Sequence, residues 1–379
     1  MLESEMKIEL ETEVKVIAMY LPQYHSIPEN DEFWGKGFTD WVSVKAATPV
    51  YEGHKQPRIP LNNNYYDLSI KQNILWQANL AKKYGVYGFG IYHYWFSREK
   101  CLLTKPAEIL LNSEEINMPF FFAWDNISWK RSWSKIKGND WSPIADDKND
   151  RNSQPLLIEY QLGGEEEWKK HFDYLLPYFK DRRYIKKDNK PVFVIYHCSE
   201  KIREMGCYWD KLAKDAGFDG VCMIYRYDTI HKIPKSERRF YYEPIHSAWG
   251  GVCERIANKL NIILGKKSVL KIYDYDKVWR NLLNRAVHTK DDNLMYGAFV
   301  SYDDTPRRGA SGKVVKGATP QKFCNYMKRL IEICNKQKKE FIFLTAWNEW
   351  GEGAYLEPDE ENTYSYLEAL QQAKSLIES

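Results

Sequence analysis

Short apolar runs alternate with longer amphipathic segments along almost the whole chain. The runs are apolar on both faces, which is typical of parallel strands buried between two layers. We predict strands at Val14–Tyr20, Val86–Tyr92, Phe120–Trp124, Val192–Tyr196, Val221–Tyr225, Phe240–Glu243, Tyr296–Ser301 and Phe341–Trp347. Apolar residues at helical spacing predict helices at Ile70–Tyr84, Glu165–Phe179, Cys207–Ala216, Pro320–Lys336 and Tyr364–Ile377. Thr319 and Pro320 are typical of an N-cap and the first helical position.

Eight strands with intervening helices predict an α/β fold, a single-domain (β/α)8 barrel with long loops on its C-terminal face. A doubly wound open sheet is the alternative. The sixth strand has the weakest pattern, so seven or nine strands also remain open. Because no repeat or Gly/Ser linker divides the chain, we predict one domain, 14–379, after an N-terminal extension, 1–13. The loops Asn126–Tyr160 and Ser247–Asp276 have the length of functional insertions.

Polar and aromatic side chains gather directly after the apolar runs. In a barrel these strand ends meet on one face, where active sites of barrel enzymes are built. Core packing is the commoner explanation for any single Tyr or His, but it explains the whole set poorly. The candidate substrate-binding residues are Tyr20, Tyr24, His25, Trp41, His54, Tyr92, His93, Tyr94, Trp95, Trp124, Asn126, Tyr196, Glu243, Tyr302, Asp303, Arg307, Trp347, Asn348 and Trp350.

Composition narrows the function classes. The 14 Trp and 27 Tyr favour a site for sugars, although burial in the core explains such rings equally well. A net charge of +3 without a clustered basic stripe argues against nucleic acid. Seven scattered Cys without a CxxC pair fit reduced thiols. The acidic N-terminus and the lack of long apolar runs predict a cytoplasmic protein without an integral membrane segment.

Two glutamates, Glu349 and Glu352, follow the last predicted strand. Glycoside cleavage normally needs two carboxyl groups beside the scissile bond, one of which protonates the leaving oxygen. Gly351 and Gly353 permit a sharp turn that brings both side chains into the barrel mouth. A Glu pair at this spacing is usually a solvated surface, but flanking tryptophans after an apolar strand favour a catalytic pair here. Glu357, the next acid, fits loop structure better.

Other constellations give weaker signals. Histidines such as His25, His93 and His197 have no metal-ligand spacing, so we predict neither a metal nor a cofactor. Lys and Arg recur with apolar residues through Arg255–Lys290. This segment is either a membrane-surface helix that contacts a lipid-linked glycan or a solvated, partly helical insertion, and we favour the insertion.

Six motifs resemble a known family when they are taken in order. They are YLPQYH, FWGKGFTDW, YGVYGFGIYHYWF, LLPYFKDRRYIKKDNKPVFVIY, DDTPRRG and AWNEWGEGAYLEPD. Together they resemble the WbsX proteins, a group related to glycoside hydrolase family 99, the endo-α-mannosidases and endo-α-mannanases. The resemblance runs from about Val16 to Leu370.

The resemblance implies a (β/α)8 barrel and metal-free, retaining chemistry on glycosides. It implies that Glu349 acts as a base on the 2-hydroxyl of the sugar, giving a 1,2-anhydro intermediate, and that Glu352 is the acid/base. This route suits α-mannosides, whose axial 2-hydroxyl can attack the anomeric carbon from the rear. The acid should have a raised pKa, through burial or the neighbouring carboxylate.

Two segments depart from the motifs of the related proteins. Asp125-Asn126-Ile127-Ser128-Trp129 replaces the usual Ala-Asn-Glu-Asn-Trp, and Asp125 is the candidate to replace the lost acid. Tyr302-Asp303-Asp304 stands where Trp-Asp-Asn is common. Because both changes affect expected sugar-contacting loops, the substrate is expected to differ from that of the related enzymes.

Three functions remain open. The first is a retaining endo-glycosidase acting on an oligo- or polysaccharide with α-mannoside-like linkages. The second is a transferase in O-antigen or capsule assembly, although no phosphate-binding loop or convincing metal-binding DxD motif is visible. The third is a glycan-binding barrel without chemistry, against which the intact Glu349 and Glu352 argue.

Overall fold

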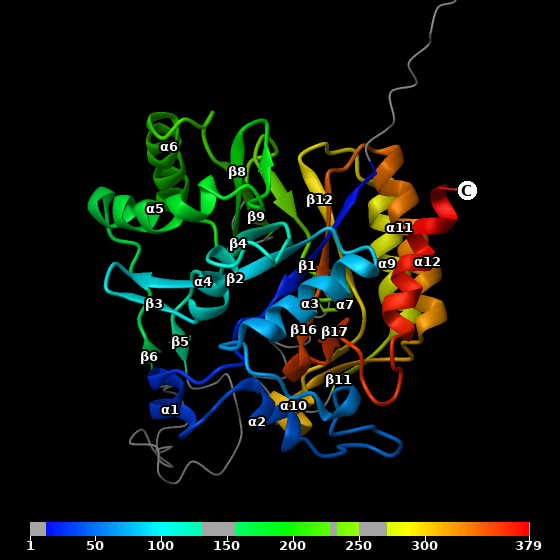
Figure 1. The fold of residues 1–379 in the computed structure, drawn as a ribbon. Coiled ribbons are helices and arrows are strands. Elements are labelled where there is room, and N and C mark those ends of the chain that lie inside the picture. The colour runs from blue at the N-terminus through cyan, green and yellow to red at the C-terminus, as the bar shows by residue number, and fades with distance from the viewer. Residues whose placement is uncertain (1–12, 131–155, 228–232, 250–270, 379) are drawn as a thin grey trace, which may run out of the picture.

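The computed structural model describes residues 13–130, 156–227, 233–249 and 271–378. Eight parallel strands form one closed sheet, in which the first strand pairs with both the second and the last, and helices lie around it (Figure 1). The strands are β1 (Lys15–Tyr20), β2 (Gly88–Ser97), β4 (Phe120–Trp124), β8 (Lys190–Ile195), β9 (Cys222–Arg226), β10 (Arg238–Phe240), β12 (Leu294–Phe299) and β15 (Phe341–Thr345). The predicted (β/α)8 barrel is confirmed, and the open sheet is excluded.

The sixth barrel strand lies earlier than predicted. β10 ends at Phe240, where the predicted strand begins. Its register pairs Arg239 with Leu294, so charged residues occupy strand positions. The Arg238 guanidinium lies 2.9 Å from Glu340, and that of Arg239 lies 2.7 Å from Asp291. Because these ion pairs satisfy both charges at the edge of the barrel, the strand lacks the continuous apolar run on which the prediction depended.

Helices separate most of the barrel strands and cover the outside of the barrel. The longer ones are α3 (Lys71–Lys83), α4 (Lys105–Leu111), α5 (Glu165–Lys180), α6 (Glu200–Asp215), α9 (Tyr275–His288), α11 (Pro320–Lys336) and α12 (Ser365–Glu378). The predicted N-cap of α11 is confirmed, since the Thr319 side chain accepts a hydrogen bond from the Lys322 backbone at 3.2 Å. α6 begins seven residues before the predicted start, where Ser199 caps it.

The loops carry short elements, most of them near the C-terminal ends of the barrel strands. The short helices are α1 (Pro28–Trp34), α2 (Asp40–Lys45), α7 (Ile245–Ala248), α10 (Thr305–Arg308), η1 (Leu61–Asn63), η3 (Gly309–Ser311) and η4 (Trp350–Glu352). The short strands are β3 (Lys100–Leu102), β5 (Trp129–Lys130), β6 (Leu156–Ile158), β7 (Lys186–Lys187), β11 (Lys271–Asp274), β13 (Tyr302–Asp303), β14 (Lys313–Lys316), β16 (Asn348–Glu349) and β17 (Ala354–Tyr355).

Large side chains fill the interior of the barrel. The rings of Phe240 and Phe343 stack with centroids 4.4 Å apart, and Phe121 lies 6.0 Å from Phe343. All three side chains are almost completely buried. The interior is therefore a packed core rather than a pore, which leaves the ends of the barrel for a site.

Several predictions fall partly outside the described residues. The two long loops include 131–155 and 250–270, and the N-terminal extension includes 1–12. The described part of the basic segment, 271–290, forms β11 and α9. The apolar face of α9 packs inward, with the ring of Trp279 stacked 5.4 Å from that of Tyr326. None of the helices in the described ranges is both long and apolar enough to cross a membrane. The division at residue 14 stays a prediction.

Candidate active site

A cavity of about 190 Å³ lies at the C-terminal ends of the barrel strands. It is lined mainly by aromatic rings, carboxylates and cations that come from many segments of the chain. The lining residues are Leu21, Tyr92, Tyr94, Asp125, Tyr196, Arg226, Tyr242, Ile245, Trp249, Tyr302, Asp304, Arg307, Arg308, Lys313, Glu349 and Glu352. This is the face on which barrel enzymes build their active sites.

Both predicted catalytic carboxylates line this cavity. After β15 the chain forms β16, turns through η4 and returns as β17, which pairs antiparallel with β16. Gly353 has φ +55°, a left-handed conformation that favours glycine. A Cβ on Gly351 would lie 2.5 Å from an oxygen of Asp40, so a side chain there would displace its neighbours. The two glycines thus permit the tight turn that carries Glu349 and Glu352.

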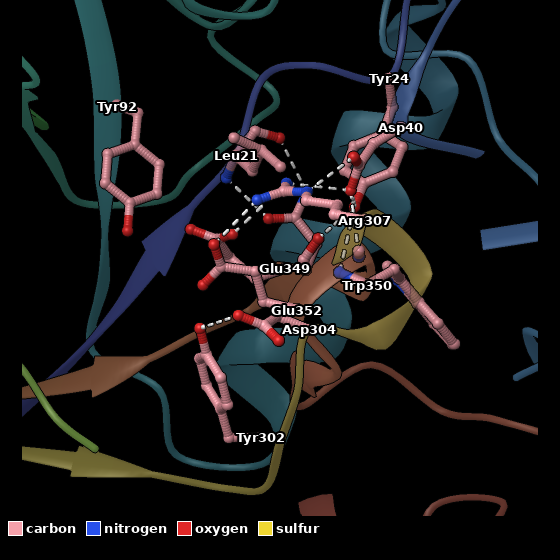
Figure 2. Close-up of polar contacts among 12 residues, drawn as sticks. Leu21, Tyr24, Asp40, Tyr92, Tyr302, Asp304, Arg307, Glu349, Trp350 and Glu352 are labelled. Carbon is pink, nitrogen blue, oxygen red and sulfur yellow. Dashed lines mark hydrogen bonds and ion pairs between the residues drawn. The ribbon is translucent and has the colours of Figure 1, made fainter. Parts of the chain in front are cut away.

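Arg307 joins the two carboxylates to the wall of the site (Figure 2). Its guanidinium lies 2.9 Å from Glu352 and 3.7 Å from Glu349. On its other side it donates two hydrogen bonds to Asp40, at 3.1 and 3.2 Å. Asp40 also accepts the Gly351 backbone N–H at 3.0 Å and the Tyr24 hydroxyl at 3.3 Å. A single buried arginine, held by two hydrogen bonds to Asp40, therefore contacts both glutamates.

The two glutamates differ in environment. Glu349 is almost completely buried, and burial together with the negative charge of Glu352 raises the pKa of Glu349 to about 8, against a lowering by Arg307. Glu352 is more exposed, with 20% of its side chain accessible, and it holds the shorter ion pair to Arg307. The raised pKa thus belongs to Glu349, the residue that the resemblance makes the base.

Two further carboxylates face the cavity. Burial raises the pKa of Asp125 to about 6, while Arg226 lowers it and Glu352 raises it. Burial also raises the pKa of Asp304 to about 6, although hydrogen bonding to the Lys313 backbone lowers it. Asp125 was the predicted replacement for the acid missing from this loop, and it lies in the cavity.

Tyrosine hydroxyls form a buried chain along one wall. The hydroxyls of Tyr92 and Tyr242 are 3.0 Å apart, and that of Tyr196 donates to Tyr92 at 3.3 Å. Burial raises the pKa of all three phenols, so they remain protonated at neutral pH. The wall therefore presents hydroxyl groups, which can donate to and accept from sugar hydroxyls.

Several predicted residues support the turn that carries Glu349 and Glu352 from behind. The Tyr24 hydroxyl donates to the Asn348 carbonyl, and Asn348 exchanges two hydrogen bonds with the backbone of Leu21. Tyr20 donates to Gln77 at 2.7 Å, away from the cavity. The remaining residues of this group are Trp41, bonded to the Tyr66 carbonyl, Trp347, packed against Phe89, and Trp350, bonded to Glu357.

His54 and Asp303 form a second support behind the Glu349–Glu352 turn. His54 Nε2 lies 2.7 Å from a carboxylate oxygen of Asp303, while its Nδ1 accepts the Val50 backbone N–H. That acceptance places the ring proton on Nε2, from which it is donated to Asp303. The other Asp303 oxygen accepts the hydroxyl of Thr305 at 2.6 Å. Both residues are outside the cavity lining, although both are buried against it.

Strand alternation carries three predicted residues to the far side of the barrel wall. Tyr92 and Tyr94 face the cavity, whereas the intervening His93 bonds to His171 of α5 at 2.8 Å. The other two residues also pack on His171, and they are Trp95, stacked at 4.4 Å, and Trp124, with ring centroids 4.7 Å away. Successive side chains of a strand point to opposite faces, so a run of polar and aromatic residues cannot lie wholly in the site.

Three more predicted residues make structural hydrogen bonds outside the cavity lining. Asn126 bonds to the backbone N–H and carbonyl of His197, and His25 bonds to the Pro22 carbonyl. Glu243 accepts from the backbone and hydroxyl of Ser247. Each of these polar groups is satisfied locally, which explains their burial.

Other lining residues were missed in the sequence-based selection. Arg226, Asp304 and Arg308 follow predicted strands and carried the same signal as the chosen residues. Tyr242 directly precedes Glu243, and only the register decides which of the two enters the cavity. Trp249 and Lys313 also line the cavity, but neither follows a predicted strand. Trp249 comes directly after α7 and Lys313 begins β14, so only the tertiary structure brings them to the cavity. In the described ranges, we find no group of three or more His, Cys, Asp or Glu arranged to hold a metal ion.

Solved structures with the same barrel fold include glycoside hydrolases. The endo-α-mannosidase of family 99 from Bacteroides thetaiotaomicron aligns over 96% of both chains, with a TM-score of 0.55 and 14% identity. A structure named glycoside hydrolase-like protein aligns over 95% of this chain and 94% of its own, with a TM-score of 0.54 and 12% identity. At these identities the likeness shows the fold alone.

The sequence assigns the family. A family model described as Glycosyltransferase WbsX matches residues 16–370, so the chain belongs to the WbsX family. WxcX proteins from two strains of Xanthomonas campestris pv. campestris are 28% identical over 366 residues, which are 94% of this chain and 49% of theirs. The chain therefore spans about half the length of these relatives.

Proposed function

We propose that this protein is a carbohydrate-active enzyme that cleaves or transfers glycosidic bonds, with Glu349 and Glu352 as its catalytic pair. The substrate in this proposal is an oligo- or polysaccharide with α-mannoside-like linkages, attacked within the chain and with retention of configuration. The observation that carries the proposal is the convergence of both glutamates on one buried arginine in a cavity walled by tyrosine hydroxyls.

The proposed reaction has two steps. Glu349 takes the proton of the 2-hydroxyl, whose oxygen attacks the anomeric carbon as the glycosidic C–O bond breaks. Glu352 donates its proton to the leaving oxygen, which gives a 1,2-anhydro sugar. Water then attacks the anomeric carbon and gives a proton to Glu352, while Glu349 returns its proton to the 2-oxygen. Both carboxyl groups regain their initial states, and two displacements retain the configuration.

The environment of Glu349 supports its role as the base. A carboxylate with a pKa near 8 binds a proton far more strongly than an ordinary glutamate, and a base is most effective when its pKa is close to the working pH. The ion pair of Glu352 with Arg307 supports the acid role differently, because Arg307 compensates the negative charge that Glu352 acquires on donating its proton.

The family name favours a second candidate, a transferase. In that reaction an acceptor sugar hydroxyl replaces water in the second step and the same residues act. Assembly of O-antigen or capsule, contact with a lipid-linked glycan and a cytoplasmic location all belong to this second proposal. A barrel that binds glycan without chemistry is the third candidate, and it requires neither glutamate to react.

Product analysis with α-mannan fragments separates these candidates. We expect wild-type protein to release shorter glycans without nucleotide, and Glu349→Gln and Glu352→Gln each to lose about 10²–10⁴-fold in rate. Turnover only with added nucleotide sugar would favour a nucleotide-dependent transferase. Full activity in either variant contradicts the assignment of the pair, and binding without turnover under both conditions supports the non-catalytic barrel.

A further inference from the structure

Charged side chains of both signs line the cavity, and its carboxylates are Asp125, Asp304, Glu349 and Glu352. Four cationic side chains line it, and two of them have evident partners within the protein. Arg307 pairs with Asp40, Glu349 and Glu352, and Arg308 lies 3.0 Å from Asp304. The other two, Arg226 and Lys313, require a separate explanation.

Aromatic rings, rather than carboxylates, hold these two cations. The Arg226 guanidinium lies 5.3 Å from the centroid of the Tyr196 ring, and the Lys313 ammonium lies 4.5 Å from that of Trp249. Across the part of the chain that the structure describes, no carboxylate oxygen approaches either cation within the 4.0 Å of an ion pair. Both side chains are partly buried. A cation–π contact orients a cation without forming an ion pair with a carboxylate.

A structural role for the two cations accounts for only part of this arrangement. Arg226 lowers the pKa of Asp125 and so stabilises that carboxylate across the cavity. Asp304, the acid nearest Lys313 in chain and space, is already satisfied by Arg308, the Tyr302 hydroxyl and the Lys313 backbone N–H. The Lys313 ammonium therefore forms no ion pair with Asp304, whose oxygens already have these partners. Burial lowers its pKa, as expected for a cation withdrawn from water without a close counter-ion.

Partly buried cations at the wall of a ligand cavity are suited to anions. Removing a charge from water is costly unless an opposite charge or hydrogen bonds replace the water. An anionic ligand supplies that compensation. Carboxylates and phosphates form short, charge-assisted hydrogen bonds with guanidinium and ammonium groups. The aromatic partner of each cation adds a surface on which a sugar ring can stack.

We propose that the cavity selects glycans that carry a negative charge, a carboxylate or a phosphate ester, beside the bond that reacts, and that Arg226 and Lys313 bind this group. The proposal rests on the glycan chemistry proposed for the same cavity and names the substrate class more closely. Uronic acids and sugar phosphates present the same chemistry to the two cations.

Binding of single sugars to the whole protein tests this directly, without dependence on turnover. The probes are D-mannose, D-mannuronate and D-mannose 6-phosphate, with dissociation constants measured by ligand-observed NMR at constant ionic strength. One charged hydrogen bond contributes enough to change affinity about tenfold or more, so we expect one or both anions to bind at least about tenfold more tightly than mannose. The two anions distinguish a carboxylate from a phosphate as the natural group.

A pair of double variants locates the effect. Arg226→Gln/Lys313→Gln should abolish the preference for the anions. The matched control is Lys201→Gln/Arg329→Gln, which removes the same charge from exposed positions on α6 and α11 and should retain the preference. If the first variant fails to fold, the wild-type comparison with mannose still decides the proposal.

Three results would overturn the proposal: equal affinity of wild-type protein for mannose and both anions, no binding of either anion, or a preference that survives in the Arg226/Lys313 variant. Failure of the catalytic proposal gives a different pattern. In that case Glu349→Gln retains full activity, or no glycan is turned over, while the preference for anions persists.

Discussion

Glu349 and Glu357 lie eight residues apart in one segment, and both are buried carboxyl groups with raised pKa values. Glu357 accepts three hydrogen bonds of 2.7 Å, from the Tyr66 hydroxyl, the Gln77 amide and the Trp350 indole. Glu349 faces the cavity, and its ion pair with Arg307 is 3.7 Å long. Burial raises the pKa of Glu357 to about 7 and that of Glu349 to about 8.

The comparison of Glu349 with Glu357 shows that burial of a carboxyl group does not by itself indicate a functional role. A buried carboxyl group surrounded by donors is held as part of the structure, because each donor would be left unsatisfied without it. A buried carboxyl group that faces a cavity has unused capacity for a ligand. A raised pKa alone does not distinguish the two groups, whereas the geometry of their hydrogen-bond partners does.

The largest expected effect is a contrast in activity between Glu349→Gln and Glu357→Gln. The first variant should lose about 10²–10⁴-fold in rate with its fold intact, because it removes a proton-transfer group. The second should lose about 2–4 kcal/mol of unfolding free energy, because an amide cannot replace a carboxylate that accepts from three donors. Glycan turnover and urea denaturation measure the two losses. If both variants lost the same activity and kept the same stability, the proposed difference between a catalytic Glu349 and a structural Glu357 would be wrong.

Arg307→Lys tests whether the proposed activity of Glu349 and Glu352 depends on the geometry of the arginine or only on its charge. Lysine keeps the positive charge but loses the planar fork that holds Asp40, Glu349 and Glu352 together. We expect a loss of about 10–100-fold in kcat, since small misplacement of reacting groups has effects of that size. Steady-state kinetics measures the loss, and near-UV circular dichroism checks the fold. Wild-type kcat in this variant would show that the charge is sufficient.

The pH profile of kcat/KM assigns the proton of Glu349. The proposed first step needs an ionised Glu349 and a protonated Glu352, so the pair must hold one proton. We therefore expect kcat/KM to fall about tenfold per pH unit above pH 8, where the pair loses that proton. Replacing Glu357 should leave this limb in place. A kcat/KM that stays constant above pH 8 would contradict the requirement for one proton on this pair.

The last comparison of the two groups concerns stability as a function of pH. Glu349 and Glu357 both have folded-state pKa values above the unfolded value of about 4.3, so the folded state binds each proton more tightly than the unfolded state. Each group therefore reduces the unfolding free energy as pH rises from about 4, by at most about 1.4 kcal/mol per pH unit. The decrease should end near pH 7 for Glu357 and near pH 8 for Glu349. The Glu349→Gln and Glu357→Gln variants should each lack the part of the decrease that comes from the replaced group. Urea denaturation at several pH values measures this.

Much of the fold could be predicted because it depends on local patterns. The runs Phe120–Trp124 and Pro320–Lys336 have the predicted bounds, since an apolar strand and a capped amphipathic helix are encoded within a few residues. β10 was predicted too late, because its arginines are neutralised by Glu340 and Asp291, far along the chain. A long-range ion pair of this kind leaves no local pattern.

The sequence by itself determined the alternation of strands and helices, the position of Glu349 and Glu352 after the last strand, and the strand ends at which polar residues gather. These features follow from periodicity and from the spacing of residues along one segment. Only the tertiary structure decided that His93 and Trp95 pack outside the barrel wall, that Asp303 supports rather than lines the cavity, and that Lys313 lies beside Trp249. The physical reason is that strand register and long-range contacts decide which face a side chain occupies, and a shift of one residue reverses that face.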